Sequence, residues 1–183
     1  MLFSSRVLSL ASLLSLLTSS ALAAEVCTYA ARGCDGLYGC CTNVEEGRCC
    51  AWFTGNSLGW SVGVSQVDAT SAWTALFSVD LRCQNANASA TAIGDGSICV
   101  STPDTPEAVN FNSAKWTTSA LQARSDEAHH NHACAEPDVV GFKTPDGKKH
   151  LIKVPEGHGQ LEYISQLLEA EDYAALTSYE HVE

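Results

Sequence analysis

Apolar and polar positions alternate along the middle of the chain with the period of a β-strand. In residues 73–83 every second position is apolar, as expected of a strand with one buried face. A weaker alternation runs through residues 60–64, and residues 98–100 form a short apolar run bounded by glycine and proline. One apolar residue interrupts the polar face of the 73–83 segment, so a helix beginning at Asp68 is the alternative for its first part. We therefore predict that residues 51–116 are rich in β-structure.

The end of the chain has a different pattern. Residues 139–142 and 150–154 flank a Pro-Asp-Gly turn, which predicts a β-hairpin. Apolar residues then recur at helical spacing through residues 161–168, and a second short helix is expected to begin near Asp172. Residues 138–183 are therefore predicted to form an acidic hairpin-helix tail.

Residues 1–23 have the three parts of a secretory signal peptide. A short stretch with one cation, Arg6, precedes the apolar run Val7–Leu17, and small residues follow in the pattern Ala-Leu-Ala at residues 21–23. The apolar run has 11 residues, whereas a membrane-spanning helix needs about 20. We predict that residues 1–23 are removed, that the protein is secreted into the extracellular space, and that it has no membrane span.

Secretion determines how the 9 cysteines are interpreted. In an oxidising compartment cysteines form disulfide bonds, whereas in the cytosol the same residues would favour metal or redox chemistry. Neighbouring side chains on extended backbone point to opposite faces, so each vicinal pair, Cys40-Cys41 and Cys49-Cys50, is expected to bond to two separate partners. Eight cysteines are predicted to close four bridges, in a connectivity that the sequence does not rank: Cys27, Cys34, Cys40, Cys41, Cys49, Cys50, Cys83 and Cys99. Cys134 is left as the odd cysteine.

Two polar segments are predicted to lie outside the regular structure. Residues 84–91 are predicted to form a surface loop that carries the sequon Asn87-Ala88-Ser89, with Asn87 as the glycosylation site. Residues 117–137 lose hydrophobicity and periodicity, and are predicted to be a polar, histidine-containing linker that proteases cut first. The expected fold class is α+β, with a small disulfide-stapled β-rich domain over residues 24–116 followed by a β-hairpin plus helical tail.

The charge balance argues against one class of partner. Acidic residues outnumber basic residues 21 to 10. Proteins that bind nucleic acid instead gather lysine and arginine against the phosphates. No nucleic-acid partner is therefore expected.

Few residues of the predicted β domain could support catalysis. Residues 24–116 contain no histidine, and the chain has neither a G-x-S-x-G nor an H-E-x-x-H motif. Scattered carboxylates keep a small two-carboxylate hydrolase open as an alternative: Asp35, Glu45, Glu46, Asp68 and Asp80. We predict that the protein is not an enzyme.

The predicted linker holds candidate metal ligands. His129, His130, His132 and Cys134 offer imidazole and thiolate groups of the kind that bind Zn²⁺ or Cu²⁺. Ordering a polar linker around an ion costs conformational entropy, so the favoured interpretation is a solvated segment with no cofactor, and Zn or Cu binding is the alternative. For Cys134, a bond into the core or an intermolecular disulfide that makes a linked dimer ranks above a metal.

Aromatic residues in the first half of the chain have two interpretations. They could stack against sugar rings or fill a small core, and we favour the core: Tyr38, Trp52, Phe53, Trp60 and Trp73. The Cys40-Cys41 pair, followed by a glycine-containing loop and a cysteine, resembles hevein-type chitin-binding modules over a short segment. A second vicinal pair stands where that family has a single cysteine. The resemblance implies a carbohydrate-binding module as one alternative.

The cysteine pattern as a whole resembles a known group. It reads C-x6-C-x5-CC-x7-CC, followed by two spaced cysteines, after a signal peptide. This pattern is similar to that of the small secreted cysteine-rich proteins of filamentous fungi, many of which are effector-like, and it differs from the hydrophobin pattern. The resemblance implies a secreted, non-enzymatic binding protein that acts on an extracellular protein or a cell-wall polysaccharide. The alternatives are a chitin- or glucan-binding module, a metal-binding secreted protein and a small carboxylate-based hydrolase.

Overall fold

Antiparallel strands dominate the computed structural model, which describes residues 23–52, 58–67, 70–118, 133–157 and 159–182. Residues 1–22 of the predicted signal peptide lie outside these ranges, and so do Phe53, Asp68 and the three linker histidines, His129, His130 and His132. Among the described residues, no helix is both long and apolar enough to cross a membrane.

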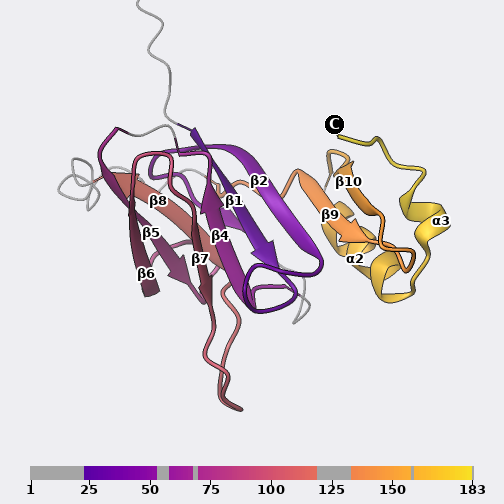
Figure 1. Ribbon diagram of the computed structural model, residues 1–183, viewed down its shortest axis with the longest axis horizontal. Coiled ribbons are helices and arrows are strands. Elements are labelled where there is room, and N and C mark those ends of the chain that lie inside the picture. Colours follow the sequence, from indigo (N-terminus) through magenta and orange to yellow (C-terminus); the bar gives the residue numbers. More distant parts are fainter. Residues whose placement is uncertain (1–22, 53–57, 68–69, 119–132, 158, 183) are drawn as a thin grey trace, which may run out of the picture.

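One sheet has six strands in the order β10-β9-β2-β1-β4-β7 (Figure 1). Its strands are β1 (Ala23–Tyr29), β2 (Tyr38–Glu45), β4 (Ser61–Ser65), β7 (Ile98–Ser101), β9 (Val139–Lys143) and β10 (Lys149–Lys153). The β9–β10 hairpin forms where the turn signal predicts it, and β9 pairs with β2 from Tyr38↔Gly141 to Cys40↔Val139. The tail hairpin therefore extends a sheet of the cysteine-rich region.

A second sheet of four strands packs against part of the first and forms the other layer of a β-sandwich (Figure 1). Its order is β3-β8-β5-β6, with β3 (Cys50–Ala51), β5 (Ala72–Ser78), β6 (Ala86–Ile93) and β8 (Ser113–Thr118). Trp73, Ala75 and Phe77 of β5 alternate inward and are at most 1% exposed, which confirms the strand period of this segment. Large aromatic rings supply much of the buried area of a core this small.

Two predictions for this sheet are wrong in part. The strand predicted over residues 73–83 ends at Ser78, because the chain turns there into a loop that the Asp80 carboxylate holds by hydrogen bonds. The alternative helix does not form over the described residues of this segment. Residues 86–91 of the predicted loop at 84–91 instead belong to β6, which pairs with β5 along its length. Its core-facing residues are alanines, so the strand has little of the hydrophobic contrast by which strands are recognised.

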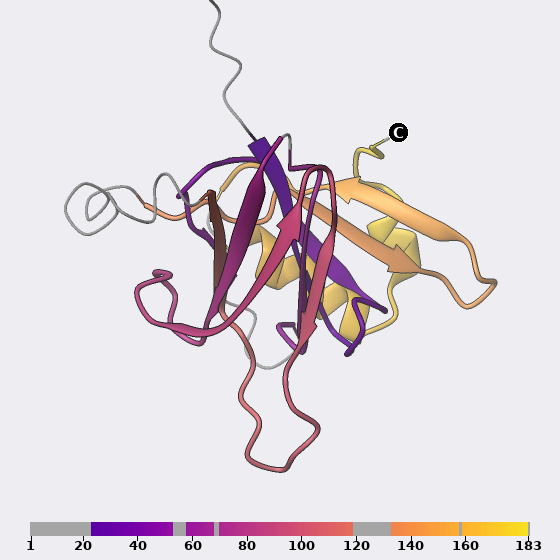
Figure 2. The same cartoon turned by 60° about the vertical axis from the view of Figure 1, so that its left-hand side comes forward.

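The tail has its own small core on one face of the hairpin. Helices α2 (Gln160–Glu169) and α3 (Tyr173–Leu176) cover that face, as Figure 2 shows in yellow behind the orange strands. The α3 helix begins where predicted, because the Asp172 carboxylate accepts a hydrogen bond from the Ala175 amide at 3.1 Å. Leu161 packs against both cores. The architecture is mostly antiparallel sheet with a short helical tail, in agreement with the α+β class.

Candidate functional site

The disulfide bonds predicted from the cysteine content are present. They are Cys27–Cys40, Cys34–Cys99, Cys41–Cys50 and Cys49–Cys83. Each vicinal pair bonds to two separate partners, since neighbouring side chains on a strand point to opposite faces. The Cys41–Cys50 bond links the two vicinal pairs to each other and runs through the core between the two sheets.

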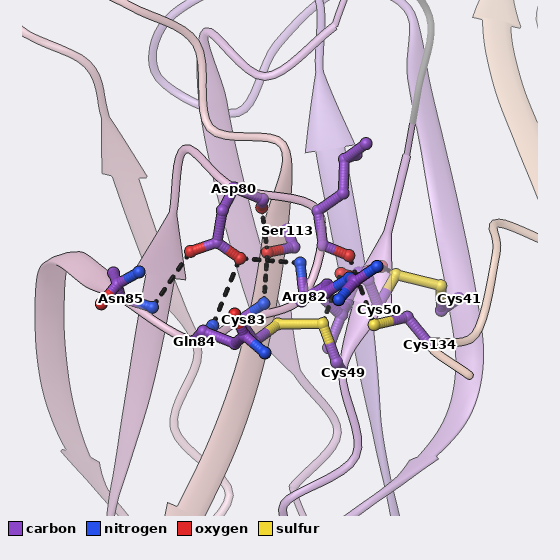
Figure 3. The surroundings of a disulfide bond; sticks show 12 residues. Cys41, Cys49, Cys50, Asp80, Arg82, Cys83, Gln84, Asn85, Ser113 and Cys134 are labelled. Carbon is purple, nitrogen blue, oxygen red and sulfur yellow. Dashed lines mark hydrogen bonds between the residues drawn. A yellow bond between two sulfur atoms is a disulfide. The ribbon is translucent and has the colours of Figure 1, made fainter. Parts of the chain in front are cut away.

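Cys134 is a free, half-buried cysteine that lies beside the Cys49–Cys83 bond. Cys50 and Ala135 form a parallel β-bridge, in which the Ala135 amide donates to the Cys49 carbonyl at 2.7 Å. This register places Cys134 next to Cys49. Figure 3 shows the Cys134 sulfur close to the disulfide.

The loop that carries Cys83 also contacts Cys134. The Cys134 thiol donates to the Leu81 carbonyl at 3.4 Å. Partial burial raises the pKa of this thiol and the nearby Asp80 carboxylate raises it further, while Arg82 and Arg48 oppose the shift. The surroundings therefore favour the thiol over the thiolate that metal binding requires.

Three of the candidate catalytic carboxylates hold backbone in place. Asp80 Oδ1 and Oδ2 accept hydrogen bonds from the amides of residues 82, 84 and 85 at 2.7, 3.2 and 3.0 Å (Figure 3). Glu46 accepts from the Thr118 amide and from its hydroxyl. Asp35 accepts from the next amide in its turn at 2.8 Å. These contacts bind the carboxylates to neighbouring loops and strands.

Glu25 and Cys27 of β1 and Cys40 of β2 bring a carboxylate and two sulfur atoms within 4.8 Å of one another. Both sulfurs are joined in a disulfide, so neither supplies the thiolate that a metal ion would need. Burial raises the pKa of Glu25, and the negative charge of Asp138 adds to the effect. We assign no metal to this cluster.

Asn87 lies on β6, the edge strand of the four-stranded sheet. The side chain is exposed, and Oδ1 accepts a hydrogen bond from the Val79 amide at 2.9 Å. A glycan would attach to the side-chain nitrogen, Nδ2, whereas the atom that accepts this hydrogen bond is Oδ1. Glycosylation at Asn87 stays a prediction, on a strand rather than a loop.

Most of the aromatic side chains are packed away from solvent. Trp52 and Trp73 are buried in the sandwich core. Trp60 is half-buried, and the Arg32 guanidinium carbon lies 4.9 Å from the centre of its ring. Tyr38 is half-buried and packs against Tyr29, with the ring centres 5.4 Å apart. No open row of aromatic rings therefore forms among these described residues.

A hollow of about 390 Å³ lies where the tail hairpin meets β2 and the C-terminal segment. Lys148, Lys149 and His150 line it from the hairpin, and His181 lines it from the other side. Tyr38 reaches it across β9, because Gly141 has no side chain to obstruct the ring. The adjacent lysines were the one signal in the sequence, while Tyr38 and His181 join them only in the folded chain. We call this feature the basic hollow.

Comparison with known proteins gives one match. A family model described as "ARB_05566_N: N-terminal domain" matches residues 25–138. The matched region begins in β1, ends directly before β9, and contains every cysteine of the chain. No curated protein and no solved structure matches the chain.

Proposed function

The chain belongs to the ARB_05566_N family through its N-terminal domain, and we propose that it is a secreted, non-enzymatic binding protein that acts on an extracellular partner. The observation that carries this proposal is the set of four disulfides. Disulfides persist in oxidising compartments and are rare in the cytosol. The signal-peptide pattern of residues 1–23 supports the same location.

The disulfides also account for how so short a region keeps its shape. They join β1 to β2, β2 to β3, the β1–β2 loop to β7, and the residue before β3 to the loop after β5. Each such bond typically contributes about 2–4 kcal/mol of stability. A rigid framework of this kind presents loops and strand edges to a partner with little loss of conformational entropy on binding.

The roles of the carboxylates support binding over catalysis. Asp80 and Glu46 are engaged with backbone amides of their neighbours. A carboxylate that serves as general acid or base must instead reach a substrate proton. The non-enzymatic assignment is part of the proposal.

The first test is expression of the full chain in a eukaryotic secretory host. We expect protein in the medium that begins at Ala24 and whose intact mass corresponds to four disulfides. The matched control lacks residues 1–23 and should stay in the cell. Wild-type protein that is retained in the cell, or that carries reduced cysteines in the medium, would contradict the proposal.

The second test separates the partner classes. Secreted protein is incubated with insoluble chitin, with insoluble β-glucan and with an extracellular protein extract, and bound and free fractions are measured. Specific, saturable binding to one of these supports the proposal and names the class of partner. Release of soluble sugar or peptide at a catalytic rate would show that the protein is an enzyme.

A further inference from the structure

The basic hollow concentrates positive charge on an acidic protein. The chain has a formal net charge of −11 at pH 7, yet Lys148 and Lys149 both line this hollow and none of its described lining residues is acidic. The nearest acidic group in the hairpin turn is Asp146, which accepts from the Thr144 hydroxyl at 2.5 Å and from the Lys148 amide at 3.3 Å. That carboxylate is held within its own turn.

The two imidazoles of the hollow are positioned by packing. The His150 ring stacks on Phe142, with the ring centres 5.1 Å apart, and Phe142 is part of the buried tail core. His181 lies 5.7 Å from His150 between ring centres, and a β-bridge to Ile152 fixes its backbone. His181 Nε2 donates a hydrogen bond to the Thr177 carbonyl at 3.3 Å, which leaves Nδ1 as the ring nitrogen of His181 that can face a ligand. Both imidazoles line the hollow together with the two lysines.

Part of the lining is less polar. Tyr38 and Leu151 lie in one row across the sheet, because Tyr38 pairs with Gly141 and Gly141 pairs with Leu151. Both residues line the hollow. Small-molecule sites commonly combine an apolar wall with a few convergent polar groups in a volume of about 300–1,000 Å³.

We propose that the basic hollow binds an oxyanion group, a carboxylate or a phosphate, carried by the extracellular partner. This inference rests on the proposed function, since the anion belongs to the partner. Ammonium and imidazole N–H groups make charge-assisted hydrogen bonds to such oxygens. The Tyr38 ring and Leu151 then contact the carbon body that carries the anion. A metal ion fits less well, because the two lysines would repel it.

The test is an NMR titration of the secreted protein, with the amides of residues 149–151 and Val182 as reporters. Glucuronic acid and inorganic phosphate are the probes, and glucose at equal ionic strength is the neutral control. We expect saturable shifts with at least one anion and none with glucose. Shifts with both probes identify the oxyanion alone as the determinant, and shifts with one probe identify a sugar carboxylate or a phosphoryl group.

Matched variants assign the binding to the hollow. Lys148→Gln/Lys149→Gln should raise the apparent Kd about tenfold, the effect expected when two exposed charge contacts are lost. Lys153→Gln is the control, since it removes a lysine from the same strand outside the hollow and should change Kd less than about twofold. His181→Gln leaves the hairpin intact and should also weaken binding, so misfolding of the double variant would not decide the result.

Three outcomes would overturn the inference. They are no shift with either anion, equal shifts with glucose and glucuronic acid, and unchanged affinity in both the double variant and His181→Gln. A failure of the proposed function has a different signature, because the wild-type chain would then be retained in the cell or would release soluble sugar or peptide at a catalytic rate.

Discussion

The Asp80 carboxylate shows how one residue organises a loop that carries a disulfide. Partial burial acts to raise its pKa, but the hydrogen bonds from the amides of Arg82, Asn85 and Gln84, together with Lys115, outweigh burial and lower the pKa below its usual value. A lowered pKa in the folded state means that the ionised form stabilises the fold. That stability is present above the unfolded pKa of about 3.9 and is lost as the pH falls through the folded value.

We therefore expect Asp80→Ala to lower the free energy of unfolding at pH 7 by about 1 kcal/mol, as for loss of a helix-capping side chain. The difference between wild type and variant should shrink as the pH falls below about 4. Thermal unfolding measured between acidic and neutral pH checks both statements. The exposed Asp95→Ala is the control and should change stability by less than about 0.5 kcal/mol. An Asp80→Ala loss that is independent of pH would contradict the assigned role.

A second residue-scale prediction concerns the neighbour of the free cysteine. Cys83→Ser leaves Cys49 without its partner, and the register of the β-bridge places Cys134 beside it. We expect the secreted variant to contain a Cys49–Cys134 disulfide, which mass spectrometry of a non-reduced digest would detect. The control Cys99→Ser should leave Cys34 unpaired with Cys134. Free thiols at both Cys49 and Cys134 would show that the two sulfurs cannot meet.

At the scale of elements, the junction between β2 and β9 depends on one glycine. A side chain at position 141 would overlap the Tyr38 ring, which lies across β9 at this point. Gly141→Ala should therefore displace the ring or part the strands, at a cost of about 1–3 kcal/mol. Denaturant unfolding checks the loss. Gly39→Ala, whose new methyl group would meet Pro137 at an ordinary 3.4 Å, is the matched control and should cost much less.

At the scale of the whole molecule, the tail and the cysteine-rich region are held together without a covalent cross-link between them in the described structure. The β2–β9 pairs and the contacts of Leu161 with both cores join them. The composition of residues 117–137 predicts proteolysis in this segment. Because Thr117 and Thr118 belong to β8 and Ala135 is paired with Cys50, we expect the cut between these two ends. After one cut, we expect the two fragments to elute as one species in native gel filtration and to separate in urea. Separate elution without denaturant would show that the sheet contacts are too weak to hold the tail.

The sequence by itself determined the features that depend on neighbours along the chain. The alternation in β5, the Pro-Asp-Gly turn of the hairpin, the capping Asp172 and the apolar stripe of α2 are local patterns, and each has its predicted place in the structure. The cysteine count predicts disulfide bonds, and the two pairs of adjacent cysteines predict that each member bonds to a different partner, as the structure shows. Local backbone preferences and side-chain periods are enough for such features.

Only the tertiary structure decided which distant segments meet. The sequence does not predict β6, because its alternating residues differ too little in hydrophobicity. The segment forms a strand because it pairs with β5. The Cys34–Cys99 and Cys49–Cys83 bonds, the addition of β9 to β2 and the basic hollow all join residues far apart in sequence. Such contacts depend on how whole strands pack and pair, and a strand edge accepts many partners with similar local preference. The packing of the complete chain selects among them.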